Sequence, residues 1–269
     1  MEFRCPTCRD RGWVVDLGGE GSGTAKRCDC GGRSAPERLL GRAGVPERYQ
    51  ACRLESFQAT GEGAGQLAAA LSACRRYVDG FVESDGRFRD SGLLLYGRPG
   101  TGKTHLAVGV LHALVERYRL RALFVDFTEL VHRIQASFDP QAPESKGSIL
   151  DAVQEAELLV LDELGAQKPS AWVSDILYLV INHRYARRRA TLFTTNFAID
   201  ESPRLADPLS LDRGADPPGS GSRGWEAEGP LSYRISARLV SRLCEMVEPV
   251  PLAGVPDFRR EVLMHQLGS

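Results

Sequence analysis

The chain has 269 residues, which is enough for one full α/β domain and a small additional module. Its net charge of −1 and its 42% hydrophobic content exclude a protein that binds nucleic acid through bulk positive charge, so any such surface must be local. We find no apolar run long enough for a membrane span and no apolar leader, and we therefore expect no membrane insertion, no secretion and a cytoplasmic location.

The first 33 residues contain two close pairs of cysteines, Cys5 with Cys8 and Cys28 with Cys30. In a cytosolic chain such pairs favour a metal site over disulfides, and four thiolates would complete a tetrahedral structural zinc site. A segment this polar also needs such a staple, because it cannot build a core of its own. The second pair departs from this pattern, because it is C-x-C rather than C-x-x-C, and the alternative is redox-active or fortuitous cysteines. We predict a zinc-binding module over residues 1–33, with a short strand at Trp13–Val15.

Residues 34–60 indicate a connector, because Pro46 interrupts helix formation and biases Val45 toward an extended form. Residues 66–83 have the spacing of an amphipathic helix. From residue 91 onward, strand and helix patterns alternate. Strands are expected at 93–96, 123–126, 158–161 and 191–195, and helices from 105 to about 118, at 129–138 with Thr128 as N-cap, at 149–156 and from about 172 to 188.

These strands are continuous apolar runs, as buried parallel strands are. The helical connections imply right-handed crossovers and helices on both faces of the sheet, so an α/β domain is expected over residues 61–269. Within it, the Pro- and Gly-rich residues 201–230 indicate a flexible loop. A helix is expected at 231–246, a short last strand at 250–252 and a terminal helix at 257–267.

The segment from Gly97 to Thr104 matches the phosphate-binding pattern G-x-x-x-x-G-K-[ST], with a strand before it and a helix after it. Its glycines let backbone N–H groups turn toward a phosphate, and the helix N-terminus adds unpaired donors. Lys103 can reach the β- and γ-phosphates, and the Thr104 hydroxyl can bind Mg²⁺. The residues predicted to bind ATP here are Gly97, Pro99, Gly100, Thr101, Gly102, Lys103, Thr104 and His105.

Two acids, Asp162 and Glu163, follow the third apolar run, at the carboxyl end of a buried strand that faces the nucleotide crevice. Asp162 can hold Mg²⁺ together with Thr104, and Glu163 can orient or deprotonate the water that attacks the γ-phosphate. The alternative is a solvated pair of acids at a strand end. Asn196, after the fourth strand, either contacts the γ-phosphate or this water, or only begins a turn.

Arginines recur along one expected helix and at the end of another. Arg234, Arg238 and Arg242 have the i, i+4, i+8 spacing of one helix face, which is either solvated or supplies an arginine finger to the nucleotide of a neighbouring chain. The earlier run complements a helix C-terminus or contacts a nucleic-acid backbone, and it consists of Arg184, Arg187, Arg188 and Arg189.

Together these motifs resemble the AAA+ ATPases of the bacterial DnaC/DnaI helicase-loader and IstB transposition-helper group. The resemblance covers most of residues 34–269 and depends on the segments 45–49, 97–107, 159–165, 194–196, 238–243 and 257–260. It implies that Asn196 is sensor 1, that Arg242 is the arginine finger and that Arg259 is sensor 2, which reads the phosphates in cis. Arg238 competes with Arg242 for the finger role, and residues 45–49 would border the adenine pocket.

The resemblance also implies partners. Members of this group bind single-stranded DNA and assemble side by side through the ATP site, and DnaI-type loaders carry a zinc-bearing N-terminal domain that docks on the replicative helicase. The cysteine module here is shorter than theirs. It nevertheless favours a loader, because the N-terminal extension of IstB-type helpers is helical and has no paired cysteines. We therefore expect a DnaC-like helicase loader with slow ATP turnover in the bacterial cytoplasm. The alternatives are an IstB-like transposition accessory ATPase and a nucleotide-gated interaction module with little turnover.

Overall fold

A five-stranded parallel sheet forms the centre of the computed structural model, which describes residues 7–8, 13–16, 24–28, 35–83, 87–167, 170–199 and 230–258. The strand order is β4-β5-β6-β3-β7, and every neighbouring pair is parallel. The strands are β3 (Gly92–Tyr96), β4 (Ala122–Asp126), β5 (Leu158–Asp162), β6 (Thr191–Thr195) and β7 (Val247–Pro251). The four strands expected from apolar runs are confirmed, and the fifth begins three residues earlier than expected.

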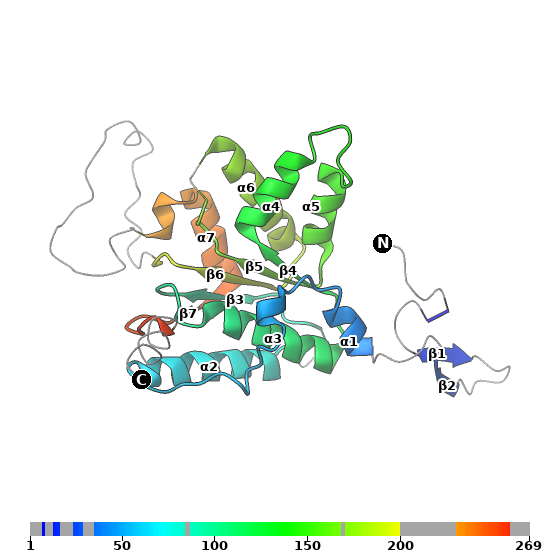
Figure 1. The fold of residues 1–269 in the computed structure, drawn as a ribbon, viewed down its shortest axis with the longest axis horizontal. Helices are drawn as coiled ribbons and strands as arrows, with labels where there is room; N and C mark the ends of the chain where they lie inside the picture. The colour runs from blue at the N-terminus through cyan, green and yellow to red at the C-terminus, as the bar shows by residue number, and fades with distance from the viewer. Residues whose placement is uncertain are drawn as a thin grey trace, which may run out of the picture.

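Helices cover both faces of this sheet (Figure 1). On one face lie α1 (Ala35–Leu40), α2 (Ala64–Asp79) and α3 (Lys103–Tyr118), and on the other lie α4 (Phe127–Ala136), α5 (Lys146–Glu155), α6 (Ala171–Ala186) and α7 (Ala237–Met246). Successive side chains of β3 point to opposite faces, so Leu93 and Leu95 join the α2–α3 core while Leu94 joins the α4–α7 core. The expected parallel α/β sheet with helices on both faces is thus confirmed.

The start of α4 corrects one sequence prediction. Thr128 is not the N-cap, because the Asp126 carboxylate accepts a 3.0 Å hydrogen bond from Glu129 N and the helix begins at Phe127. Asp126 is the last residue of β4, so strand and helix join without a loop. The next helix, α5, also begins earlier than expected, because Ser145 caps it through Ser148 N.

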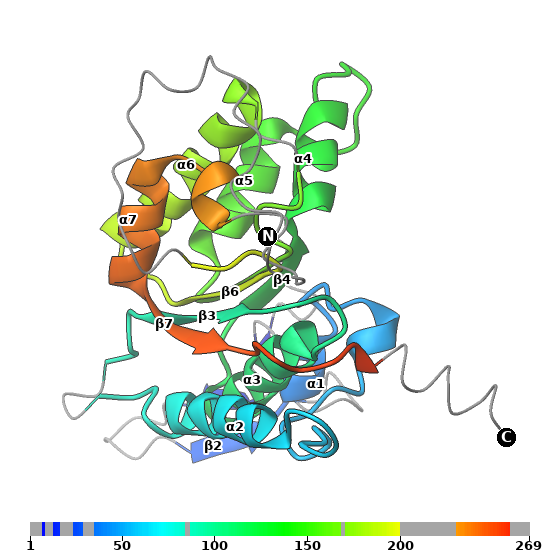
Figure 2. The ribbon, with the colours of Figure 1, turned by 90° about the vertical axis from the view of Figure 1, so that its left-hand side faces the viewer.

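The expected helix over 231–246 is wrong in its first half. Leu231–Tyr233 form a 3₁₀ turn, and Ser236 is extended before α7 begins at Ala237. Arg234 therefore lies outside the helix, and only Arg238 and Arg242 share a face of α7. Figure 2 shows α7 leading directly into β7, which lies beside β3.

The N-terminal segment contains a hairpin of β1 (Trp13–Asp16) and β2 (Thr24–Arg27), which are antiparallel and include the strand expected at Trp13–Val15. The segment predicted as a connector holds α1 and a 3₁₀ turn at Glu47–Tyr49. The expected loop at 201–230, apart from its last residue, and almost all of the terminal helix at 257–267 lie outside the described residues. Within the described ranges, we find no helix long and apolar enough to cross a bilayer.

Candidate functional site

The phosphate-binding segment joins β3 to α3, and its backbone requires glycine at several positions. Gly97, Gly100 and Gly102 have φ values of 152°, 78° and 93°, in the region that other residues rarely adopt. At Gly97 a Cβ atom would lie 2.7 Å from the Leu252 carbonyl oxygen, so the close approach of the chain after β7 also excludes a side chain. The loop between the strand and the helix thus depends on these three glycines.

Lys103, the first residue of α3, is buried against the loop that precedes it. Its ammonium group donates to the carbonyl oxygens of Gly97 at 2.9 Å and of Arg98 at 2.6 Å. The Thr101 hydroxyl donates to the same Arg98 carbonyl at 2.9 Å. The loop therefore closes around one positive charge at a helix N-terminus, which is an arrangement suited to phosphate.

Asp162 lies at the carboxyl end of β5, only 4% exposed, and two hydroxyl groups donate to its carboxylate. Thr104 Oγ1 is 3.0 Å and Thr194 Oγ1 is 2.5 Å from Asp162 Oδ1. Burial raises the pKa of Asp162, although both hydrogen bonds act in the opposite direction. Within the described residues no cation pairs with this carboxylate. A buried carboxylate beside a threonine hydroxyl is the kind of oxygen donor set that Mg²⁺ prefers.

Glu163 follows in the turn after β5, with an exposed side chain and a φ of 58°. A left-handed backbone at a residue other than glycine costs roughly 1–2 kcal/mol, so the turn must be held by its neighbours. Thr194 holds it, because its Oγ1 accepts a 3.0 Å hydrogen bond from Glu163 N and its carbonyl accepts one of 2.8 Å from Leu164 N. The sequence did not single out Thr194 as a site residue, because it is one of three threonines in β6, with Thr191 and Thr195.

Asn196 lies one residue beyond β6 and is partly buried, at the same edge of the sheet as Asp162. His105 makes its contacts with the connector, because its Nε2 lies 2.9 Å from the Arg53 carbonyl oxygen and its ring meets Phe57 edge-on at 5.3 Å. Phe57 also covers Gly102, where a Cβ atom would lie 2.6 Å from its ring. The connector thus contacts the phosphate-binding segment directly, which the sequence did not reveal.

The C-terminal part of the described chain also contacts the loop. Phe258 N donates a 3.2 Å hydrogen bond to the Gly100 carbonyl oxygen, and the Asp257 carboxylate lies against Gly100. Arg259, the expected sensor 2, is the next residue and lies outside the described residues. The two preceding residues therefore bring the chain to the phosphate-binding segment.

The arginines that the sequence analysis singled out lie in different environments. Arg184 is 1% exposed and donates to the carbonyl oxygens of Val153, Gln154, Ala156 and Ala190 and to Thr191 Oγ1. It therefore joins α5 to β6, and the idea that it contacts nucleic acid is wrong. Arg189 is partly buried against Glu155, whereas the side chain of Arg188 is 82% exposed.

On α7, Arg238 is exposed and Arg242 is partly buried between two tyrosines of α6. Arg234, in the turn before α7, lies 4.5 Å over the Phe197 ring.

Of the four N-terminal cysteines, the structure describes two. Cys8 is buried and Cys28 is partly buried, whereas Cys5 and Cys30 lie outside the described residues. The pairing of Trp13 with Arg27 brings the chain before β1 and Cys28, just after β2, to the same end of the hairpin. Among the described residues no group of three metal-binding side chains occurs, and only two of the four expected ligands are among them.

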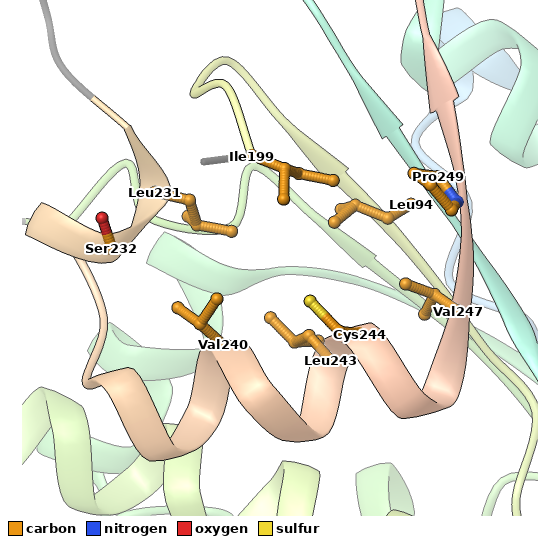
Figure 3. Close-up of a pocket in the computed structure, with 9 residues that line it drawn as sticks. All are labelled: Leu94, Ile199, Leu231, Ser232, Val240, Leu243, Cys244, Val247 and Pro249. Carbon is orange, nitrogen blue, oxygen red and sulfur yellow. The ribbon is translucent and has the colours of Figure 1, made fainter. Parts of the chain in front are cut away.

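A separate apolar pocket lies between α7 and the sheet (Figure 3). Leu94, Leu243 and Val247 line it together with Cys244, and none of the residues around it belongs to the predicted ATP site. The described residues of the predicted ATP site gather instead at the carboxyl edge of β3, β5 and β6, with the exception of Arg242, which lies on α7.

Comparisons with known proteins point to one group. The model of the family described as IstB-like ATP binding protein matches residues 60–208. The protein YqaM of Bacillus subtilis (strain 168) is 25% identical over 243 residues, which cover 74% of this chain and 75% of YqaM. The replicative helicase loader DnaC of Escherichia coli (strain K12) is 28% identical over 177 residues, which cover 66% of this chain and 68% of DnaC. A crystal structure of the DnaC helicase loader superposes with a TM-score of 0.58 at 27% identity, covering 77% of this chain and 99% of that chain.

Proposed function

The chain belongs to the IstB-like ATP-binding proteins and is a DnaC-like ATPase, and we propose that it loads a replicative helicase onto single-stranded DNA. Its sheet is that of the P-loop AAA+ fold that the sequence predicts. In this proposal, ATP binding drives side-by-side assembly on DNA, and hydrolysis releases the assembly.

One observation carries the nucleotide chemistry: the Asp162 carboxylate is buried at hydrogen-bonding distance from the Thr104 hydroxyl, next to the glycine loop. Thr104 and Asp162 are the residues that would hold Mg²⁺, which neutralises the charge on the phosphates when it is bound. Lys103 and the loop N–H groups would bind the phosphates themselves. Because the pKa of Asp162 is raised by burial, a cation at this position would also relieve the penalty of the buried charge.

The remaining roles follow from position. Glu163, exposed beside Asp162, would orient the attacking water and accept its proton, and Asn196 would contact the γ-phosphate or that water. Arg259 would reach the phosphates in cis, which the contact of Phe258 with Gly100 supports. Arg242 would act in trans on the nucleotide of a neighbouring copy. We further propose that residues 34–60 are the connector between the N-terminal module and an ATPase domain of residues 61–269.

We also propose that residues 1–33 bind one structural zinc ion through Cys5, Cys8, Cys28 and Cys30 and dock on the helicase. The hairpin register supports this, because it brings the start of β1 and Cys28, just after β2, to the same end of the hairpin. Metal analysis of the purified chain should find about one zinc per chain, lost when Cys5→Ser and Cys8→Ser are combined. An N-terminus that stays folded without metal would contradict the site.

The principal alternative is a transposition accessory ATPase that acts on duplex DNA with a transposase. The family match favours it, since the matching model is that of IstB-like proteins. The identity to DnaC and the paired cysteines favour the helicase loader instead.

A pull-down of a replicative helicase and of a transposase with the full chain distinguishes the two functions. Binding of the helicase that depends on ATP, and that is lost in Lys103→Ala, is the expected result. Binding of a transposase without any contact to the helicase would overturn the proposal. The Glu163→Gln variant should retain ATP and the assembled state, whereas continued turnover would exclude Glu163 as the base.

A further inference from the structure

Two exposed tyrosines of α6 enclose the one arginine of α7 that is partly buried. Tyr178 and Tyr185 are seven residues apart, which places them on the same face two turns apart. The Arg242 guanidinium carbon lies 5.1 Å from the centre of the Tyr178 ring and 5.8 Å from that of Tyr185. Both distances are within the range at which an aromatic face attracts a guanidinium group.

A hydrogen bond to α7 fixes one of the two rings beside the arginine. The Tyr185 hydroxyl donates to Glu245 Oε2 at 2.6 Å, and Glu245 lies three residues after Arg242 on α7. Arg242 lowers the pKa of Tyr178, as a cation close to a phenol does. The side chain of Arg242, which has many rotamers, is therefore confined to a narrow set of positions.

The hydrogen bonding of Arg242 is nevertheless incomplete. Its Nη1 is buried and has no acceptor among the residues that the structure describes. A buried guanidinium N–H without an acceptor is energetically unfavourable. The free energy of Arg242 would therefore fall if this N–H donated to an anionic oxygen. The phosphate oxygens of a nucleotide supply such acceptors in the planar, paired geometry that guanidinium favours.

The neighbouring arginine lacks this arrangement. Arg238 lies one turn earlier on the same helix and is exposed, with no aromatic contact among the described residues. Since the sequence leaves the finger role open between these two arginines, the aromatic enclosure distinguishes Arg242.

We propose that Tyr178 and Tyr185 are positioning residues that hold Arg242 at the α6–α7 surface for delivery to the nucleotide of a neighbouring copy of this chain. The inference rests on the proposed function, in which Arg242 acts in trans. The rings are 39% and 38% exposed, so they form part of the surface that the neighbouring copy would meet. Without them Arg242 would have to be ordered anew at each assembly, and the rate of hydrolysis would fall.

The test measures ATP turnover by full-length chains, alone and mixed. Tyr178→Leu combined with Tyr185→Leu should reduce kcat by about tenfold with little change in KM, since two partly exposed cation–π contacts are lost. The corresponding pair of Tyr→Phe substitutions keeps the aromatic faces and should retain most of the activity. Tyr233→Leu is the matched control, because Tyr233 is 65% exposed and lies outside the enclosure.

Mixing two variant chains distinguishes a loss of Arg242 positioning from damage to the fold of the double variant. A Lys103→Ala chain has no working ATP site of its own but carries an intact Arg242 with both tyrosines. Added to the Leu double variant, it should restore turnover above the sum of the two separate rates, because it supplies the arginine to the variant's nucleotide. Failure of this rescue, or equal loss with the Phe pair, would overturn the positioning role.

Arg242→Ala serves as the reference for the proposed function. It should be inactive alone and rescued by the same Lys103→Ala chain. If Arg242→Ala turns over like the wild type, the trans role of Arg242 is wrong. If Arg242→Ala behaves as expected while the Leu double variant matches the wild type, only the inference about the tyrosines fails.

Discussion

Thr194 holds both acids of the candidate site: its hydroxyl donates to Asp162 Oδ1 at 2.5 Å, and the same oxygen accepts from Glu163 N at 3.0 Å. The two acids lie at the end of β5, whereas Thr194 belongs to β6. The position of the Asp162 carboxylate relative to the exposed Glu163 is therefore set by the neighbouring strand, and the same hydrogen bonds stabilise the left-handed backbone of Glu163.

Replacing Asp162 by Asn should abolish ATP turnover without lowering the stability of the nucleotide-free protein. Burial raises the pKa of Asp162, so the ionised form is disfavoured in the folded protein, and stability from this group is lost as the pH rises through the folded pKa. Asp162→Asn removes the buried charge while its amide oxygen still accepts from Thr104 and Thr194. We expect the nucleotide-free variant to melt at or above the wild-type temperature at pH 7 and to lose ATP turnover.

Adding MgATP should stabilise the wild type but not Asp162→Asn. At a hundredfold excess over its dissociation constant, a ligand stabilises the folded state by about 2.7 kcal/mol, and the wild type should show this gain in thermal unfolding while Asp162→Asn does not. A variant that is stabilised by MgATP as much as the wild type would contradict the role of this carboxylate.

Gly102→Ala should disturb the contact between the connector and the phosphate-binding segment. The left-handed backbone alone costs roughly 1–2 kcal/mol, and the new Cβ would lie 2.6 Å from the Phe57 ring. Gly61→Ala is the matched control, since Gly61 has a φ of 77° and open space around it. Denaturant unfolding should show a larger loss for Gly102→Ala, and the excess should shrink in a Phe57→Leu background. Equal losses at the two glycines would exclude the contact.

His112 should make the stability depend on pH below neutrality. Burial and the nearby Arg53 lower the pKa of His112 from 6.5 to about 4. The neutral ring is thus favoured in the folded state, and the stability from this group is present above pH 6.5 and is lost as the pH falls toward 4. Unfolding measured between these two values should show a steeper loss in the wild type than in His112→Gln. Parallel pH profiles would contradict the shift.

Arg184 should be required for stability rather than for DNA binding. Arg184→Met leaves several buried carbonyl oxygens without a donor, which predicts a loss of about 3 kcal/mol or more. Arg184→Lys should recover little, because one ammonium group cannot reproduce the planar set of donors. Arg188→Met is the control at an exposed position and should change the unfolding free energy by less than about 0.5 kcal/mol. Similar losses at both positions would refute the structural role.

The sequence by itself determined the parallel sheet, its helices and the residues of the phosphate-binding segment. Continuous apolar runs identify buried strands because both faces of each strand must be covered, and β6 was predicted with its observed bounds, Thr191–Thr195. The glycines and Lys103 were also identifiable, since their geometry is local to one strand–loop–helix unit. The predicted helix starts were wrong at two places. Asp126 is both the last residue of β4 and the N-cap of α4, and the extended backbone of Ser236 delays the start of α7.

Only the tertiary structure decided which distant side chains meet. The strand order β4-β5-β6-β3-β7 places Thr194 beside Asp162, and the packing of α6 on α7 places Arg242 between Tyr178 and Tyr185. The burial of Arg184 also depends on three elements that come together only in the fold. The spacing of residues along the sequence does not predict such contacts. It indicates the period of one helix or strand, but not which other element packs against it.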